Sequence, residues 1–263
     1  MDPSLIVGVV AGLLLLMYAI GVGNLKHFLS LPGATIVIGG TFAALIASFP
    51  LKALKKVPGQ MRKAIRGEFM NPGLYIDQIA DCAHVARKFG LLALEKLAEA
   101  QEDDFMRDSM LVIVDAVDAN KTRYMLESEL MYLDERHTEA IAFFERGALL
   151  SPSFGLVGTL IGLIIMLANL GLEDVDGTAT LTNGMAIALI STFYGSLLAN
   201  LFFTPIAGRL HSQNDREMLC KRIIAEGILS IQAGENPMYI RKKLISFLPY
   251  KDRAEFEKTE NAS

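Results

Sequence analysis

Four long stretches without a single charged side chain constrain this protein more than any other feature of its sequence. They cover residues 4–23, 33–49, 148–170 and 181–205, and none contains Asp, Glu, Lys, Arg or His. A helix needs about 20 apolar residues to cross a hydrocarbon core of about 30 Å, and each stretch is near that length. Because every backbone polar group must be satisfied within lipid, we expect four membrane-spanning helices.

The apolar excess is local, since the chain also carries an ordinary share of charge. Of its 263 residues, 52% are hydrophobic and 21% are charged, and the mean hydropathy is +0.36. The formal net charge is -4, which disfavours a general nucleic-acid binder. We therefore expect very apolar segments alternating with very polar ones.

The stretches form two close pairs, which divide the chain into four parts. We expect transmembrane helices one and two in residues 1–50, a cytoplasmic helical domain in 51–147, transmembrane helices three and four in 148–207, and a cytoplasmic C-terminal helix and tail in 208–263. Lys52, Lys55 and Lys56 follow the first pair and Arg209 follows the second, whereas the link 171–180 is acidic. The positive-inside rule then places both large polar parts and both termini in the cytoplasm.

The polar parts carry apolar residues at helical spacing, so we expect an all-α protein. Residues 76–86 form one such segment, which Gly90 can end, and 91–98 and 106–117 form two more. From Thr122 the pattern continues toward the third span, and from Leu210 it continues away from the fourth. We expect spans three and four to extend into the cytoplasm as continuous helices, the latter stopping at residues 234–237.

The spans lack the buried acid or histidine that normally carries an ion through a membrane protein. If the protein handles ions, another chain must supply the carboxylate.

The fourth span has a stripe of small residues and, beside it, a polar stripe. The small stripe is Gly184, Ala188, Ser191, Gly195 and Ala199, and the polar stripe is Thr192, Ser196, Asn200 and Thr204. Two interpretations stay open: close packing within the chain with hydroxyls bonded to their own helix, or a polar lining that faces a partner helix or water.

Two prolines and one charged segment complete the candidate features. Pro152 and Pro205 stand at the cytoplasmic ends of spans three and four, where each either forms a hinge or marks the helix leaving the membrane. Residues 87–99 carry mixed charge, and on a single helix Lys88 and Glu95 would lie two turns apart on one face. That face is either a docking surface or simply solvated.

No metal-ligand spacing, nucleophile elbow or phosphate loop is present in the sequence, so we expect no enzyme and no cofactor.

At this point the sequence resembles the MotA/PomA family, the A subunit of the bacterial flagellar stator, within the MotA/TolQ/ExbB superfamily. The resemblance runs along nearly the whole chain. Five segments carry it, namely residues 86–95, 134–137, 152–163, 184–195 and the Pro205-Ile206-Ala207 step.

The resemblance implies a function in motility. It implies a homopentamer around B-subunit (MotB-type) helices in the bacterial cytoplasmic (inner) membrane, with the B subunit supplying the ion-binding Asp. Flow of H⁺ or Na⁺ would then drive torque on a FliG-type rotor protein. By the same resemblance, the rotor-interaction residues are Arg87, Lys88 and Glu95, with Glu99 as an extension.

The resemblance also assigns roles within the membrane part. Pro152 and Pro205 would couple ion passage to movement. Thr159, Ser191 and Thr192 match hydroxyl residues that line the ion pathway in sodium-using members, but the acid that such members carry near Ser30 is absent here. Both ions therefore stay open. An alternative is an ExbB/TolQ-like energiser of outer-membrane transport, which usually has three spans.

Overall fold

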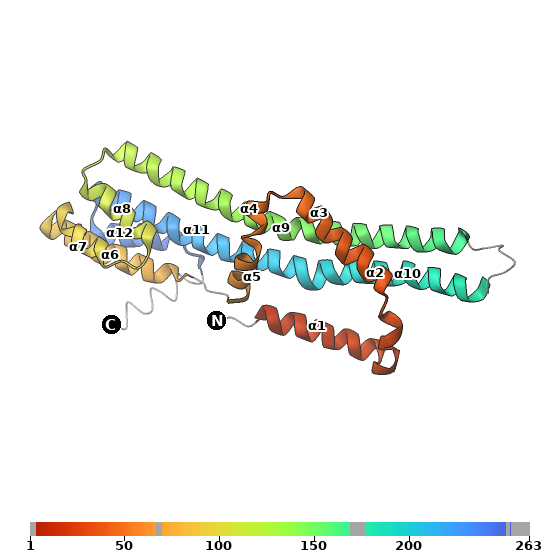
Figure 1. Cartoon of the computed structure of the whole chain (residues 1–263). Helices are drawn as coiled ribbons and strands as arrows, with labels where there is room; N and C mark the ends of the chain where they lie inside the picture. The colour runs from red at the N-terminus through yellow and green to blue at the C-terminus, as the bar shows by residue number, and fades with distance from the viewer. Residues whose placement is uncertain (1–3, 67–69, 169–176, 251–252, 254–263) are drawn as a thin grey trace. The chain divides into compact units, whose positions relative to one another are not determined.

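The structure, a computed structural model, describes residues 4–66, 70–168, 177–250 and 253 (Figure 1). Across these ranges the chain forms helices and no strand, which confirms the all-α prediction. The chain divides into two compact units. Unit 1 comprises Met1–Glu68 and Thr138–Gln213, and unit 2 comprises Phe69–His137 and Asn214–Ser263. The helices α9 (Ala119–Ala168) and α11 (Thr204–Gln232) each contribute to both.

Unit 1 contains the helices of the apolar stretches and the short helices beside them. They are α1 (Ser4–Ile20), the short 3-10 helix η1 (Val22–Phe28), α2 (Leu31–Ala34), η2 (Thr35–Gly39), α3 (Gly40–Ser48), α4 (Leu51–Leu54), α5 (Val57–Arg66), α10 (Gly177–Leu197) and η4 (Leu198–Phe203). Unit 2 contains α6 (Pro72–Phe89), η3 (Leu91–Ala93), α7 (Leu94–Glu99), α8 (Asp104–Val114) and α12 (Pro237–Ile245).

Three of the four expected spans are helices long and apolar enough to cross a membrane, counted over the described ranges. They are Leu31–Ser48, Ala119–Ala168 and Leu181–Gln232. The first stretch differs from expectation: α1 ends at Ile20 after 17 residues, and the chain then bends by 99° into η1. Gly21, with φ of 79°, stands at this bend. A fourth span results if the bent pair is taken together. The predicted link 171–180 lies mostly outside the described residues.

The two long helices confirm the prediction that spans three and four continue without a break into the polar segments. The helix α9 has 50 residues and includes Pro152 in its interior. From Gly177 to Gln232 the chain is also helical throughout, and it ends before the turn at Gly234. The final helix α12, which follows that turn, was not among the predicted elements.

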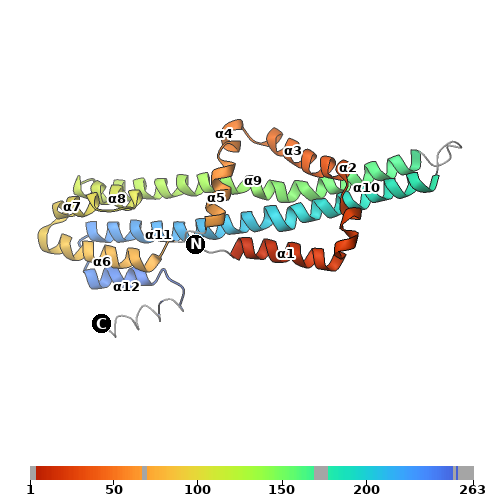
Figure 2. The same ribbon diagram turned by 60° about the horizontal axis from the view of Figure 1, so that its bottom comes forward.

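Helices α9 and α10 pack so closely that their backbones touch, and Figure 2 shows them side by side. A Cβ atom on Gly162 would lie 2.5 Å from the Gly184 carbonyl oxygen and 2.7 Å from the Ala188 amide nitrogen. A Cβ atom on Gly195 would lie 2.6 Å from the Ser151 carbonyl oxygen. Only a hydrogen atom fits at these positions, which is how small residues bring helices together in membranes.

Pro205 is preceded by a wider, π-helical turn. Pro205 has no N–H to donate, and its ring crowds the carbonyl one turn earlier. Residues Leu198–Phe203 form the π-helix η4, and the Thr204 amide donates to the Ala199 carbonyl, five residues back. This register change keeps the chain helical across the proline, as π-turns do at irregular points in helices.

Each unit has its own apolar core. In unit 1, Leu45, Phe144, Phe203 and Ile206 are among the buried residues, and α5 packs against them with Ala64. In unit 2, α11 is buried on most sides between residues 218 and 232, and its Ile223, Ile224 and Ile228 are fully buried. The helices α6, α7, α8 and α12 also contribute to that core, as do Leu126 and Leu130 of α9 and Leu248 after α12.

We predict that Gly162→Ala destabilises unit 1, because its methyl group would meet backbone atoms that cannot move aside. Overpacking of this kind costs about 1–3 kcal/mol. The matched control is Gly208→Ala on α11, where nothing lies within 4 Å of the added Cβ atom, so the better helix propensity of Ala should stabilise by up to ~1 kcal/mol. Thermal unfolding in detergent measures both. Equal unfolding temperatures for the two variants would contradict the packing.

Candidate functional site: a polar membrane face and a charged helical turn

The polar stripe of α10 and the small-residue stripe lie on different faces of the helix. Gly184, Ala188, Ser191, Gly195 and Ala199 are buried, whereas Thr192, Ser196, Asn200 and Thr204 are exposed on the single chain. The two open interpretations therefore apply to different faces. The small stripe packs against α9, and the polar stripe is left uncovered by the described part of the chain.

Of the three candidate pathway residues, the structure brings two together. The hydroxyl oxygens of Thr159 on α9 and Thr192 on α10 lie 2.6 Å apart. Each hydroxyl has one proton to donate, and the other acceptors within its reach are carbonyls of the helix pair: those of Gly155 at 3.1 Å and Ala188 at 3.2 Å for Thr159, and that of Ala188 at 3.3 Å for Thr192. These two hydroxyls form a small polar cluster with free lone pairs at the edge of the exposed stripe.

The third candidate, Ser191, points the other way. Its side chain is fully buried, and it donates to the Ile187 carbonyl at 2.7 Å. A Cβ atom on Gly33 of α2 would lie 3.2 Å from its oxygen, and one on Gly158 of α9 would lie still closer. Successive residues are 100° apart around a helix, so Ser191 and Thr192 cannot share one face.

Pro152 lies directly against α10. A Cβ atom on Gly195 would be 3.2 Å from the Pro152 Cα atom, so the proline turn of α9 contacts α10 at a glycine. The turn is further held by its neighbours, because Ser151 donates to the Gly147 carbonyl at 2.6 Å and Ser153 to the Leu149 carbonyl at 3.0 Å. Pro205 stands ten positions after Gly195, beyond the π-helical turn.

Tyr194 makes a contact that sequence reasoning missed. Its hydroxyl accepts from the Ser30 amide at 3.1 Å and donates to the Phe28 carbonyl, while Phe28 and Phe193 pack edge to face. Ser30 caps α2 by accepting from the Gly33 amide at 3.2 Å. The position where an acid was expected in sodium-using members is thus occupied by a helix cap tied to α10.

The charged segment of unit 2 is not one helix. Gly90 has a φ of 82° and ends α6, so Lys88 lies at the end of α6 and Glu95 at the start of α7. Lys88 and Glu95 therefore do not lie on one face of a single helix. Even so, Arg87, Lys88, Glu95 and Glu99 are all exposed.

Exposed apolar side chains accompany these charges. Phe89 and Leu92 are exposed, and the Lys88 ammonium lies 5.2 Å from the centre of the Phe89 ring. Leu94 and Ala98, by contrast, are buried in the core of unit 2. The burial of these two side chains holds the short helix α7 with Glu95 and Glu99 on its solvent-exposed side. The turn combines charge with uncovered apolar surface, as protein-docking surfaces do.

We predict that Gly90→Ala disturbs this turn, because its backbone, with φ of 82° and ψ of 169°, lies in a region that is essentially restricted to Gly and costs other residues about 1–3 kcal/mol. Hydrogen exchange should speed up over residues 88–99 and stay unchanged at α12. The control is Gly59→Ala on α5, which has open space at the added Cβ atom and no positive φ. Unchanged exchange over 88–99 would show that the glycine conformation is not needed there.

Comparison with known proteins agrees with this arrangement. The MotA/TolQ/ExbB proton channel family model matches residues 97–222. Motility protein A of Borreliella burgdorferi is 38% identical over 248 residues, which cover 94% of each chain.

Two solved structures are similar over nearly the whole chain. The structure of C. jejuni MotAB has a TM-score of 0.82 at 27% identity, and the match covers 95% of this chain and 97% of that one. The flagellar MotAB stator complex from Bacillus subtilis has a TM-score of 0.81 at 28% identity, with 94% and 98% covered. The chain therefore belongs to the MotA/TolQ/ExbB proton channel family, and within it to the motility protein A group.

Proposed function

We propose that this protein is the A subunit of a flagellar motor stator, which converts ion flow into torque for bacterial motility. The observation that carries the proposal is the likeness to a flagellar MotAB stator complex over nearly the full length of both chains. The ExbB/TolQ-like alternative is not favoured, because the likeness to motility protein A extends over unit 1 and unit 2 alike rather than over the shared membrane core alone.

A B-type subunit is the partner that this function requires. Both solved structures are of complexes of a MotA with a MotB. In this chain the four uncharged stretches offer hydroxyls but no carboxylate, so the ion-binding acid comes from the partner. The polar stripe with the Thr159–Thr192 pair is the uncovered membrane face best suited to meet it. The transported ion is H⁺ or Na⁺, and no resident cofactor is needed.

The remaining features of the assembly follow from the same proposal. The protein is a multi-pass inner-membrane protein with four spans and with both termini in the cytoplasm. It assembles as a homopentamer and pushes on a FliG-type rotor protein through Arg87, Lys88, Glu95 and Glu99. Their exposure supports this role. Pro152 and Pro205 couple ion passage to movement, a role supported by the Pro152–Gly195 contact and the π-helical turn before Pro205.

Charge reversal at the turn tests the rotor contact. In a strain that lacks its own copy, we expect wild type to restore swimming and Glu95→Lys or Arg87→Glu to abolish most of it, because the docking charges would repel. The control is Lys242→Glu, an equal charge reversal at an exposed residue of α12. Swimming speed and membrane content of the protein are measured together.

The outcomes separate the possible errors. If wild type fails to restore swimming although filaments are present, the stator function is wrong. Normal swimming of both reversal variants, at normal membrane content, would remove these residues from the rotor contact. Equal losses in Lys242→Glu would show a general effect of charge.

The ion pathway is tested by removing single hydroxyls. We expect Thr192→Val to raise the ion concentration needed for half-maximal swimming speed, because it removes an acceptor from the uncovered cluster. Ser191→Ala should change this concentration little, since Ser191 is buried on a different face of α10. Titrating Na⁺ with and without a proton uncoupler identifies the ion. A larger effect of Ser191→Ala would place the pathway on the other face of α10.

A further inference from the structure

We propose that Asp103 is a positioning residue for the rotor-contacting turn, acting through a buried ion pair with Lys221 of α11. This inference rests on the proposed function and extends it to two residues outside the turn itself. Asp103 follows the last residue of α7, Glu99, by four positions, and it is the N-cap residue directly before α8. Asp103 therefore lies just after the charged turn in the chain, at the start of the next helix.

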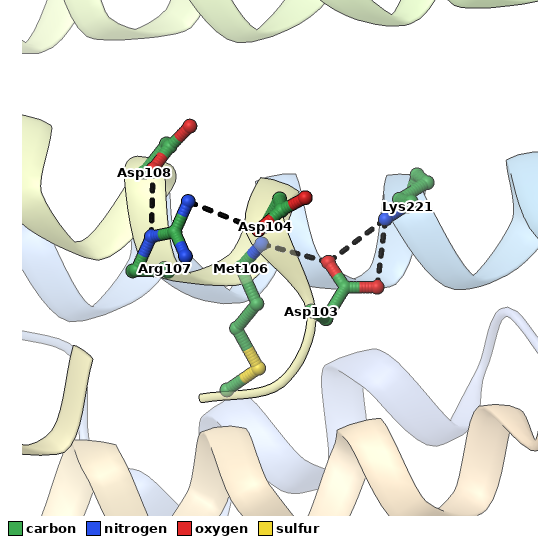
Figure 3. A network of polar contacts seen from close by, with 6 residues as sticks. All are labelled: Asp103, Asp104, Met106, Arg107, Asp108 and Lys221. Carbon is green, nitrogen blue, oxygen red and sulfur yellow. Dashed lines mark hydrogen bonds and ion pairs between the residues drawn. The ribbon is translucent and has the colours of Figure 1, made fainter. Parts of the chain in front are cut away.

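Asp103 joins three elements of unit 2 through one carboxylate. It caps α8 by accepting from the Met106 amide at 2.9 Å. It accepts from the Lys221 ammonium at 2.8 and 2.7 Å, one bond to each oxygen, as Figure 3 shows. It also accepts from the Tyr75 hydroxyl of α6 at 3.2 Å. A carboxylate that accepts this many bonds has a fixed position and orientation.

The pair is shielded from water, unlike its neighbours. The side chains of Lys221 and Asp103 are only 9% and 13% exposed, and Lys221 also lies 5.2 Å from the centre of the Phe105 ring. Burial by itself raises the pKa of Asp103, but the hydrogen bonds from Lys221 and Met106 outweigh it and hold the pKa below its ordinary value. The adjacent pairs of Arg107 with Asp104 and Asp108 are largely exposed, so they contribute little.

Stability alone does not account for a buried ion pair at this place. Replacing such a pair with well-packed apolar residues is often neutral or stabilising, whereas a fixed register is a use that buried ionic groups serve in other proteins. Here the residues whose position matters are those of α7, which packs on the core of unit 2 through the apolar side chains of Leu94 and Ala98. Apolar contacts are not directional, so the directional bonds of the Asp103–Lys221 pair set the position of α7 on this core.

The helix that carries Lys221 gives the pair its link to function. Lys221 stands 16 positions after Pro205 in the same α11. A force that reaches α11 in unit 2 is therefore transmitted to α8 and the turn through a short, charge-assisted contact. Loss of either partner leaves a buried charge unpaired and the turn held only by apolar contacts.

The test measures torque per stator unit in the complete complex with the B subunit in the membrane. Stepwise speed changes of a bead on one motor give both the torque of each unit and the number of units. We expect Asp103→Asn and Lys221→Met to lower the torque of each unit several-fold while membrane content stays normal. The charge exchange Asp103→Lys with Lys221→Asp should restore part of it.

The control is Lys243→Met, which breaks another short ion pair of unit 2. Lys243 of α12 lies 2.6 Å from Glu226, away from the turn in sequence. We expect it to lower the unfolding temperature of the purified complex about as much as Asp103→Asn does, with the torque of each unit unchanged. Equal torque losses for the two variants at equal loss of stability would reduce Asp103 to a structural role and overturn the proposal.

A milder variant keeps the test valid if Asp103→Asn does not accumulate. Tyr75→Phe removes only one hydrogen bond to Asp103, and we expect a smaller loss of torque per unit in the same direction. Unchanged torque in Tyr75→Phe would then overturn the proposal. Failure of the wild-type protein to restore any rotation would instead refute the stator function itself.

Discussion

The rest of unit 1 depends on the close approach of α9 and α10. At Gly162 and Gly184 the two backbones are separated by less than a methyl group. This contact fixes the rotation of α10 about its axis, so the small residues face α9 and the row from Thr192 to Thr204 faces outward. It also sets the Pro152 turn against Gly195. The glycines at the α9–α10 contact therefore determine which residues form the exposed polar face.

Satisfied hydroxyls are what make that face tolerable in lipid. At this face the Thr159 and Thr192 hydroxyls lie within hydrogen-bond distance of each other and of helix carbonyls, so each of their protons has an acceptor in the apolar layer. Their oxygen lone pairs remain available on the exposed side. A face of this kind can accept bonds from water or a cation, but it has no group that changes charge.

The sequence predicts the long elements well, because their signals are local. An uncharged stretch of about 20 residues indicates a span from composition alone, and Gly90 ends a helix through its own backbone preference. The Asp103–Lys221 pair has no such signal, since its partners lie 118 residues apart. The only trace is a lysine on the otherwise apolar arc of α11, between Met218 and Ile224. The division of Ser191 from Thr192 was equally hidden, because it depends on which face α9 covers.

The polar side chains of the two units differ in charge. In unit 1 the polar side chains of the uncharged stretches are neutral hydroxyls and amides, so under the proposed function an ion passing nearby meets no fixed charge of this chain there. In unit 2 charge is abundant, and the Asp103–Lys221 pair is held inside the core. A motor subunit needs this separation, because a fixed charge beside the pathway would trap or repel the ion. Under the proposed function, a neutral surface toward the rotor would lack the charge complementarity that directs docking to a charged partner.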